Sequence, residues 1–487
     1  MVDKKLSNNI ITATKWSFIT NLMRKMITPV TNMILARLLT PDAFGVVATI
    51  NIVISFSELF SDAGFQKYLV QHEFENERDL YKTATVAFWT NFCVSVIIWL
   101  FIAVFRDSIA SMVGSKGYGF HLVIASLAIP FAALSSIQQA IYKRSFDFKG
   151  LFLPRLINSI VPIFVTIPLA YSYRNCWALI VGTLLGSISD AVILTIKSKW
   201  KPRLYYSYKY LINMFSFSFW TLLESLSIWL TINIDIFILG SSLSNYYIGL
   251  YKISITTVDQ ITTVITTTIV PVLFSTLSRC QDNEKNFKNI FYSFQNKAAI
   301  LLIPLSFGMF IFGDFITTFL LGEKWVEAIQ FISMLGLVQG FIVIFANFAS
   351  EVYRSKGEPR VSFFVQLCYV LTVIPILIMA SKERFNTLCL YRVLMSLYFI
   401  SIHITILCCR YRFNMFDLFV NIKSAFFASL LMSSVGLYLN RIADDIPLKF
   451  LSIITCIIIY FLSCMFFKDT RETIKDMCLK AKSIVVK

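Results

Sequence analysis

The chain has 487 residues, of which 57% are hydrophobic and 15% charged, and its formal net charge is +16. Its mean hydropathy of +0.70 lies far above that of soluble domains and excludes a soluble, basic nucleic-acid-binding protein. The composition instead predicts an integral membrane protein, in which the placement of the basic residues reflects topology.

Apolar segments follow one another along the whole chain. A hydrocarbon core about 30 Å thick requires roughly 20 mostly apolar residues per helix. Fourteen such spans are predicted, beginning near Lys15, Ala43, Ala84, Gly117, Leu151, Cys176, Leu211, Tyr246, Phe291, Val326, Val361, Thr387, Ile422 and Leu448. If the N-terminus is cytoplasmic, most of the 44 Lys and Arg residues fall on the cytoplasmic side. We therefore expect an all-α polytopic membrane protein with both termini in the cytoplasm.

The break between the first two spans, "ILARLLTPDAFG" at residues 34–45, has an echo in "ILGSSLSNYYIG" at residues 238–249. Thr40 followed by Pro41 predicts a capped helix start, and Ser244 takes the place of Thr40 in the echo. The offset maps the turn after the first span onto the turn after the seventh. It predicts two six-helix lobes in a parallel pseudo-repeat, residues 1–204 and 205–415, followed by two helices and a basic cytoplasmic tail at residues 416–487.

Polar and charged residues lie on helical faces of the first two spans of each predicted half. They recur at helical spacing in four groups: Asn21, Arg24 and Thr28; Ser55, Glu58 and Asp62; Glu224 and Asp235; and Lys252, Thr256 and Asp259. A charge at mid-bilayer costs at least about 2.5 kcal/mol, so we expect these faces to line a central polar cavity between the lobes. In the alternative interpretation, Arg24 or Lys25 pairs with Glu58 and the charges fix helix packing.

Residues 34–71, "ILARLLTPDAFGVVATINIVISFSELFSDAGFQKYLVQ", also carry a family resemblance. The "ARLLTP" turn, the Phe44-Gly45 pair and "FSDAGF" running into "LVQ" resemble the first hairpin of Wzx-type, WzxC-like polysaccharide flippases. These belong to the multidrug, oligosaccharidyl-lipid and polysaccharide exporter superfamily. The resemblance implies a bacterial inner-membrane flippase that moves a polyprenyl-diphosphate-linked oligosaccharide to the periplasmic leaflet by alternating access. Such a protein serves the biosynthesis of surface polysaccharide such as lipopolysaccharide, and its cavity is lined mainly by helices 1, 2, 7 and 8.

The chemistry of this task assigns candidate roles to the embedded residues. Cations suit the diphosphate and hydroxyl or amide groups suit sugars, which selects Arg24, Lys25, Lys252, Asn21, Thr28, Ser55 and Thr256. Deeply placed acids suit coupling to protons or sodium, which selects Glu224, Asp259, Glu58, Asp62 and Asp235. The ten cysteines and three histidines show no metal-ligand spacing, so no metal site and no cofactor is expected.

Two alternatives remain open at this point. One is a small-molecule exporter of the same fold, whose cationic substrates fit poorly with three cations on the cavity-facing helices. The other is a membrane glycan polymerase or ligase, which would be expected to carry a substantial outside loop, absent from the predicted topology. We expect a transporter and not an enzyme, acting as a monomer on a lipid-linked oligosaccharide among membrane lipids. Polysaccharide polymerase and glycosyltransferases are the expected protein partners, and nucleic acid is not.

Overall fold

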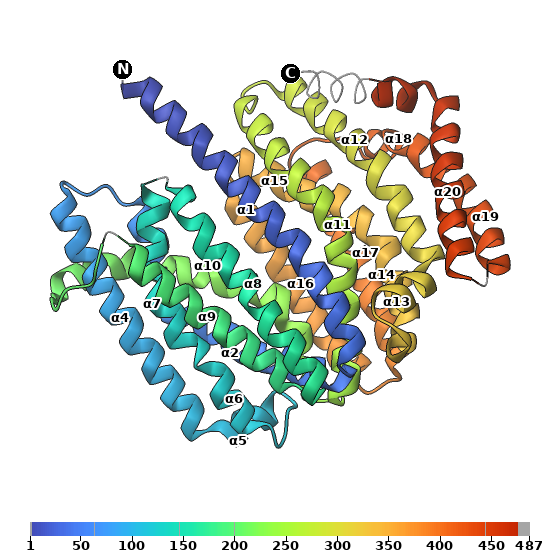
Figure 1. The fold of residues 1–487 in the computed structure, drawn as a ribbon. Coiled ribbons are helices and arrows are strands. Elements are labelled where there is room, and N and C mark those ends of the chain that lie inside the picture. Colours follow the sequence, from blue (N-terminus) through green and yellow to red (C-terminus); the bar gives the residue numbers. More distant parts are fainter. Residues whose placement is uncertain (1, 63, 146, 199, 444, 476–487) are drawn as a thin grey trace. The chain divides into compact units, whose positions relative to one another are not determined.

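The computed structural model describes residues 2–475 apart from residues 63, 146, 199 and 444, and their side chains except those of residues 2–15, 17–19, 22, 62, 216–221, 224 and 359. The described residues form helices joined by short turns, and no strand occurs among them. A helix bonds its own backbone groups, which is what an apolar segment needs in a bilayer. The chain divides into two compact units, Met1–Lys252 and Ile253–Lys487 (Figure 1).

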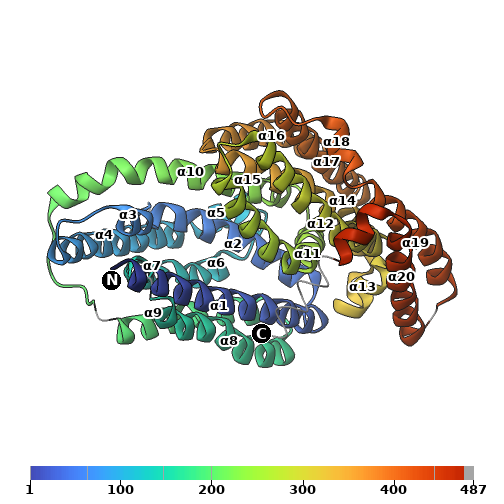
Figure 2. The ribbon, with the colours of Figure 1, turned by 90° about the horizontal axis from the view of Figure 1, so that it is seen from above.

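The first unit contains ten helices and the start of an eleventh. They are α1 (Val2–Leu38), α2 (Pro41–Asp62), α3 (Phe65–Gln71), α4 (Glu77–Val104), α5 (Arg106–Met112), α6 (Gly119–Ser126), α7 (Ala128–Arg144), α8 (Phe148–Tyr173), α9 (Trp177–Lys197), α10 (Tyr208–Gly240) and α11 (Asn245–Arg279). Within this unit α8 packs along both α1 and α9, and α7 packs against α4 and α9 (Figures 1 and 2).

The second unit contains the rest of α11 and the later helices. They are α12 (Glu284–Ile311), α13 (Gly313–Leu320), the 3-10 helix η1 (Glu323–Ala328), α14 (Ile329–Phe341), the π-helix η2 (Ile342–Asn347), α15 (Phe348–Ser355), α16 (Pro359–Ala380), α17 (Phe385–Cys409), α18 (Met415–Val420), α19 (Lys423–Ile442) and α20 (Ile446–Phe466). The main core of this unit is formed by buried aliphatic and aromatic side chains of α12, η2, α15 and α17.

Twelve helical segments among the described residues are long and apolar enough to cross a bilayer. They coincide with twelve of the predicted spans. The other two predicted spans, the first and the seventh, are α1 with 37 residues and α10 with 33 residues, and both carry the embedded polar residues noted above. The all-helical, multi-pass class is thus confirmed, while the count of fourteen and the division at residues 204 and 415 stay predictions.

The two echoed turns lie against each other inside the first unit. As predicted, α2 begins at Pro41, and the carbonyl oxygen of Thr40 accepts the backbone N–H of Ala43 at 3.1 Å. A Cβ added to Gly45 would lie 1.8 Å from the carbonyl oxygen of Asn245, and one added to Gly249 would lie 1.9 Å from that of Pro41. The contact is therefore reciprocal, because each glycine admits the backbone of the other turn.

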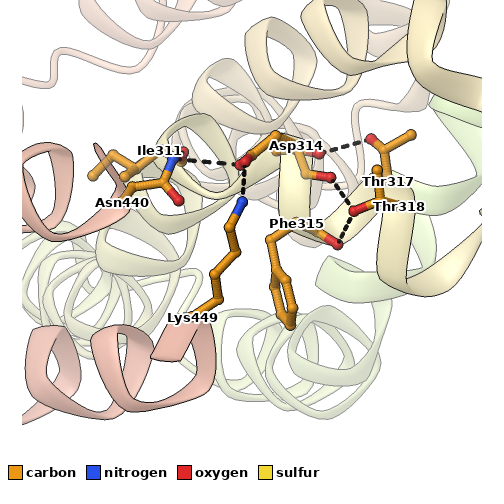
Figure 3. Close-up of polar contacts among 8 residues, drawn as sticks. Ile311, Asp314, Phe315, Thr317, Thr318, Asn440 and Lys449 are labelled. Carbon is orange, nitrogen blue, oxygen red and sulfur yellow. Dashed lines mark hydrogen bonds and ion pairs between the residues drawn. The ribbon is translucent and has the colours of Figure 1, made fainter. Parts of the chain in front are cut away.

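A polar cluster fastens α19 and α20 to the rest of the second unit. The carboxylate of Asp314, at the start of α13, accepts from the Lys449 ammonium of α20 and, at 3.4 Å, from the Asn440 amide of α19 (Figure 3). The same amide donates to the carbonyl oxygen of Ile311 at 3.1 Å. Since α19 and α20 also pack along each other, this cluster ties the final hairpin to the end of α12.

Candidate functional site

A polar cavity of about 300 Å³ lies inside the first unit. Its walls come from α2, α3, α4, α7, α8 and α9, and most of its lining side chains are amides, hydroxyls or carboxylates. They are Glu58, Ser61, Gln66, Asn91, Ser135, Ser136, Gln139, Asn158, Ser187 and Asp190, with Ile129, Ala132 and Ala133. Burying this many polar groups inside a membrane protein costs free energy unless they form hydrogen bonds with one another or with a ligand.

Hydrogen bonds link the cavity wall into a chain that crosses four helices. The Ser61 hydroxyl donates to Oδ1 of Asn91 at 2.6 Å, and the Asn91 amide donates to Oγ of Ser136 at 3.1 Å. The Gln66 amide donates to the same hydroxyl at 3.1 Å, and the Lys143 ammonium donates to Oε1 of Gln66 at 2.9 Å. This series of hydrogen bonds fixes the orientations of polar side chains from α2, α3, α4 and α7 around the cavity.

Asp190 of α9 is the buried acid of this cavity, with 7% of its surface exposed. Its Oδ2 accepts the amide of Gln139 at 3.0 Å, and Arg155 of α8 and Arg24 of α1 both act on it electrostatically. Sequence reasoning missed Asp190 and Arg155, because polar faces were sought mainly on the first two spans of each half. A signal was present, since Thr183, Ser187 and Asp190 have the same 0, 4, 7 spacing as the faces that were chosen.

Of the predicted face of α1, Arg24 lies near this cavity, since it acts electrostatically on Asp190. Nε of Arg24 donates to Oγ of Ser159 on α8 at 3.1 Å, and the neighbouring residue Asn158 lines the cavity. Asn21 and Thr28 are exposed on the same helix, while Lys25 is half-buried. Arg24 thus has a hydrogen-bond partner on α8, while the alternative pairing of Arg24 or Lys25 with Glu58 stays a prediction.

Two faces of α2 border different environments. Glu58 and Ser61 line the polar cavity, whereas Val53, Phe56 and Phe60 line an apolar groove of about 890 Å³ with side chains of α4, α5 and α10. Ser55 lies near the boundary, where its hydroxyl oxygen accepts the indole N–H of Trp229 at 2.9 Å. The Phe56 and Trp229 rings, 5.0 Å apart, form part of the groove wall. The polar cavity and the apolar groove thus flank one helix, α2.

The other candidate residues lie on α2, α10 and α11 and differ in their surroundings. Asp235 is buried, with 6% of its surface exposed, and its Oδ2 accepts the Tyr251 hydroxyl at 2.9 Å. Lys252 and Thr256 are half-buried on α11, and Oδ1 of Asp259 accepts the Gln339 amide at 2.9 Å within the second unit. The side chains of Asp62 and Glu224 lie outside the described residues. The predicted meeting of these residues around one central cavity stays a prediction.

The arrangement can bind a polar solute. Alternating donors and acceptors, with a buried carboxylate near two guanidinium groups, match the hydroxyls and charged groups of a polar solute. Among the described residues, no three His, Cys, Asp or Glu side chains are grouped so as to hold a metal ion.

The described helices thus form a multi-pass membrane fold with a polar cavity beside an apolar groove, an arrangement that can hold an amphipathic solute. The chain belongs to the polysaccharide biosynthesis protein family, whose model matches residues 34–330.

Named relatives agree with this assignment, and solved structures share the fold. The chain is 23% identical to the succinoglycan biosynthesis transport protein ExoT of Rhizobium meliloti (strain 1021), over 69% of this chain and 67% of that protein. It is 20% identical to the lipopolysaccharide biosynthesis protein WzxC of Escherichia coli (strain K12), over 77% and 76%. Its fold is similar to that of the lipid II flippase MurJ in an inward closed conformation, with a TM-score of 0.73 and 17% identity over 93% and 98% of the two chains.

A multidrug resistance MATE family transporter in an inward-facing conformation has the same fold, with a TM-score of 0.62 and 12% identity over 85% of this chain and 95% of that one. The resemblance noted in the sequence, to Wzx-type flippases of the wider exporter superfamily, is confirmed.

Proposed function

We propose that the chain is a flippase that carries polyprenyl-diphosphate-linked oligosaccharide from the cytoplasmic to the periplasmic leaflet of a bacterial inner membrane. The observation that carries the proposal is the polar cavity on one face of α2 and the apolar groove on another. Such a substrate has a polar head and a hydrocarbon tail. The family membership and the named polysaccharide and lipid II relatives support the same substrate class.

The two environments match the energetic problem of moving such a lipid. Each sugar hydroxyl buried without a partner costs a few kcal/mol, and a buried diphosphate costs far more. The amides and hydroxyls around Asn91, Ser136 and Gln139 would replace water for the sugars. The groove with Phe56, Phe60 and Phe101 would keep the hydrocarbon tail in an apolar medium.

Within this scheme, Arg24 is the main candidate for holding the diphosphate, with Lys252 and Lys25 as secondary cations. The fork of a guanidinium can bind two phosphate oxygens at once. Asn21, Thr28, Ser55 and Thr256 would contact the head group. Asp190 and Gln139 join this set as candidate sugar-binding groups, because both line the cavity and are bonded to each other.

Ion coupling would be carried by the embedded acids, namely Glu224, Asp259, Glu58, Asp62 and Asp235. The membrane potential supplies about 2.3 kcal/mol per elementary charge per 100 mV, enough to bias alternating access driven by protons or sodium. The chain would work as a monomer without another cofactor and without catalysing a covalent step. The polymerase and glycosyltransferases of its pathway are its expected partners.

Replacing Arg24 tests the assignment. We expect Arg24→Ala to reduce flipping of a fluorescent lipid-linked oligosaccharide in proteoliposomes by more than about tenfold, because one charge-assisted contact contributes about 1.5–3 kcal/mol. Arg24→Lys should retain part of the activity, since it keeps the charge but loses the fork. Lys116→Ala, on an exposed turn away from the described cavity, is the control.

Full flipping by Arg24→Ala at a normal protein level would remove the diphosphate role. Export of cationic dyes by the unaltered chain, without flipping of the lipid-linked sugar, would contradict the function itself. Joining of lipid-linked units by the purified chain would instead identify a polymerase.

A further inference from the structure

The segment between α9 and α10 is basic and aromatic and exposes large apolar side chains. It reads "WKPRLYYSYK" at residues 200–209, and it lies beside the first turns of α4 (Figure 1). Leu204 is 95% exposed, and Tyr206 and Tyr208 are 54% and 69% exposed. An exposed Leu among Tyr, Lys and Arg side chains is typical of a segment that dips into the interfacial layer of a membrane.

Contacts with α4 hold this segment in place. Trp200 is buried, with its ring 5.9 Å from that of Phe88. The indole N–H of Trp89 donates to the carbonyl oxygen of Arg203 at 2.9 Å, and the hydroxyls of Thr90 and Tyr206 lie 3.2 Å apart. The exposed side chains therefore project from an anchored backbone.

Between this segment and α4 lies a basic hollow of about 810 Å³. Its lining consists of four cations, one carboxylate, three aromatic rings and a hydroxyl: Arg78, Lys82, Lys201, Arg203, Glu77, Tyr81, Trp200, Tyr205 and Thr85. The charge pattern of the chain predicts that this end of the first unit faces the cytoplasm.

Three of the four cations remain available to a ligand. Lys201 is engaged, because its ammonium donates to the carbonyl oxygens of Thr195 and Ile196 at the end of α9. Within the part of the chain that the structure describes, Arg78, Lys82 and Arg203 form no ion pair. The Lys82 ammonium lies 5.9 Å from the centre of the Tyr205 ring. Three available cations and a single carboxylate, Glu77, line the hollow, so its wall carries an excess of positive charge.

The second unit has a hollow at the corresponding place in the chain. There Asn283 and Glu284 begin α12 as Asn76 and Glu77 begin α4, and both asparagines accept a backbone N–H three residues later. This hollow, of about 340 Å³, is lined by Lys288, Lys356, Arg410 and Arg412 among others.

The cations of this second hollow are largely engaged within the protein. The Lys288 ammonium donates to the carbonyl oxygen of Arg412 at 2.7 Å, the Lys356 ammonium to that of Gln281 at 2.5 Å, and Arg410 pairs with Glu358. Each unit therefore has a basic hollow at the corresponding place in its sequence. The hollow of the first unit is the larger, and three of its cations remain available to a ligand.

We propose that the hollow of the first unit binds the phosphate group of an anionic phospholipid of the cytoplasmic leaflet. Arg78, Lys82 and Arg203 would hold the phosphate, while Leu204 and the tyrosine rings lie among the upper acyl chains and glycerol groups. A soluble acidic protein would explain the cations but not the exposed Leu204. The proposal is separate from the transport function, since none of these residues lines the polar cavity.

The test counts lipids retained by the full-length chain in native mass spectrometry after purification in mild detergent with added phosphatidylglycerol or phosphatidylcholine. The unaltered chain should retain phosphatidylglycerol preferentially, and less of it at high salt. The double variant Arg78→Gln/Arg203→Gln should lower its affinity by about tenfold or more, since each surface cation near an anionic membrane contributes about fivefold. Lys116→Gln/Lys382→Gln, which removes the same charge from exposed turns, is the matched control and should leave retention unchanged.

A second arm distinguishes a lipid from a free phosphate compound. Leu204→Ser keeps every cation, so it should weaken retention of phosphatidylglycerol while leaving any binding of inorganic pyrophosphate unchanged. Equal retention of both lipids by the unaltered chain would overturn the proposal, as would displacement of phosphatidylglycerol from the control variant but not from Arg78→Gln/Arg203→Gln. Tight binding of pyrophosphate together with no effect of Leu204→Ser would show a soluble anion as the ligand. Since Leu204→Ser replaces only an exposed side chain, it remains informative if the double variant does not fold.

Discussion

At the level of single residues, the embedded polar groups of this chain are matched by specific neighbours on other helices. Asp190 receives an amide from Gln139, and Asp235 receives a hydroxyl from Tyr251. Bonds of this kind reduce the cost of placing a carboxylate among apolar helices. They also fix the orientation of the acids, which a binding or coupling role would require.

Outside the spans, Glu358 between α15 and α16 illustrates a charged contact whose strength depends on pH. Its two carboxylate oxygens accept from Nε and Nη2 of Arg410 at 2.9 and 3.0 Å, and the Tyr411 hydroxyl donates at 2.6 Å. Hydrogen bonds from Arg410 and then from Tyr411 lower the pKa of Glu358 below its usual value of 4.5. Because the folded-state pKa is depressed, this contact stabilises the protein above the unfolded-state pKa and is lost as the pH falls through the folded-state value.

Replacement of Glu358 by Gln should therefore destabilise the chain at neutral pH by about 0.5–1 kcal/mol, a small value because the pair is partly exposed. The difference from the unaltered chain should shrink as the pH falls below 4.5, where both chains lack the charge. Thermal unfolding of both chains in detergent, from neutral pH to below pH 4.5, measures this difference in stability. Glu383→Gln, at an exposed turn, should show no comparable loss, and a loss for Glu358→Gln that stays constant with pH would contradict the ion-pair explanation.

At the level of elements, the two echoed turns are joined by a close backbone contact. Gly45 meets the backbone of Asn245, and Gly249 meets that of Pro41. The repeat of glycine at the same place in both turns thus has a steric reason, because any side chain at either position would separate α2 from the start of α11.

Gly45→Ala and Gly249→Ala should each destabilise the chain by about 2–3 kcal/mol or more, since the added carbon would overlap backbone atoms that cannot rotate away. Thermal unfolding of the purified variants measures the effect. Gly308→Ala in α12 is a matched control, because a Cβ there meets nothing within 4 Å, and it should be neutral or stabilising by up to about 1 kcal/mol. Equal unfolding temperatures for Gly45→Ala and the unaltered chain would rule out the close contact.

At the level of the whole molecule, the distribution of Lys and Arg predicts which ends of the helices face the cytoplasm. Alkaline phosphatase fused after Lys116 should be active in the periplasm, whereas a fusion after Lys201 should be inactive, because positively charged segments are retained in the cytoplasm. Green fluorescent protein fused at the same positions provides the reciprocal control, since it should fluoresce only after Lys201. The opposite pattern would reverse the proposed direction of transport.

The sequence alone determined the class of the protein and the course of its helices. Span positions follow from local composition, because about 20 apolar residues are needed to cross a bilayer and each helix bonds its own backbone. The start of α2 at Pro41 was also predictable from local sequence, because Thr40 followed by Pro41 is typical of a helix N-terminus. The embedded residues Arg24 and Glu58 were also visible, since a charge stands out in an apolar segment.

Only the tertiary structure decided which of these residues meet. Asp190 and Gln139 are 51 residues apart, and Arg24 reaches Ser159 across 135 residues. Such partners depend on the rotation and packing of whole helices, which the composition of a single segment does not specify. The polar cavity likewise exists only when six helices are assembled, and the apolar groove beside α2 only when four are, because each helix supplies just part of the wall.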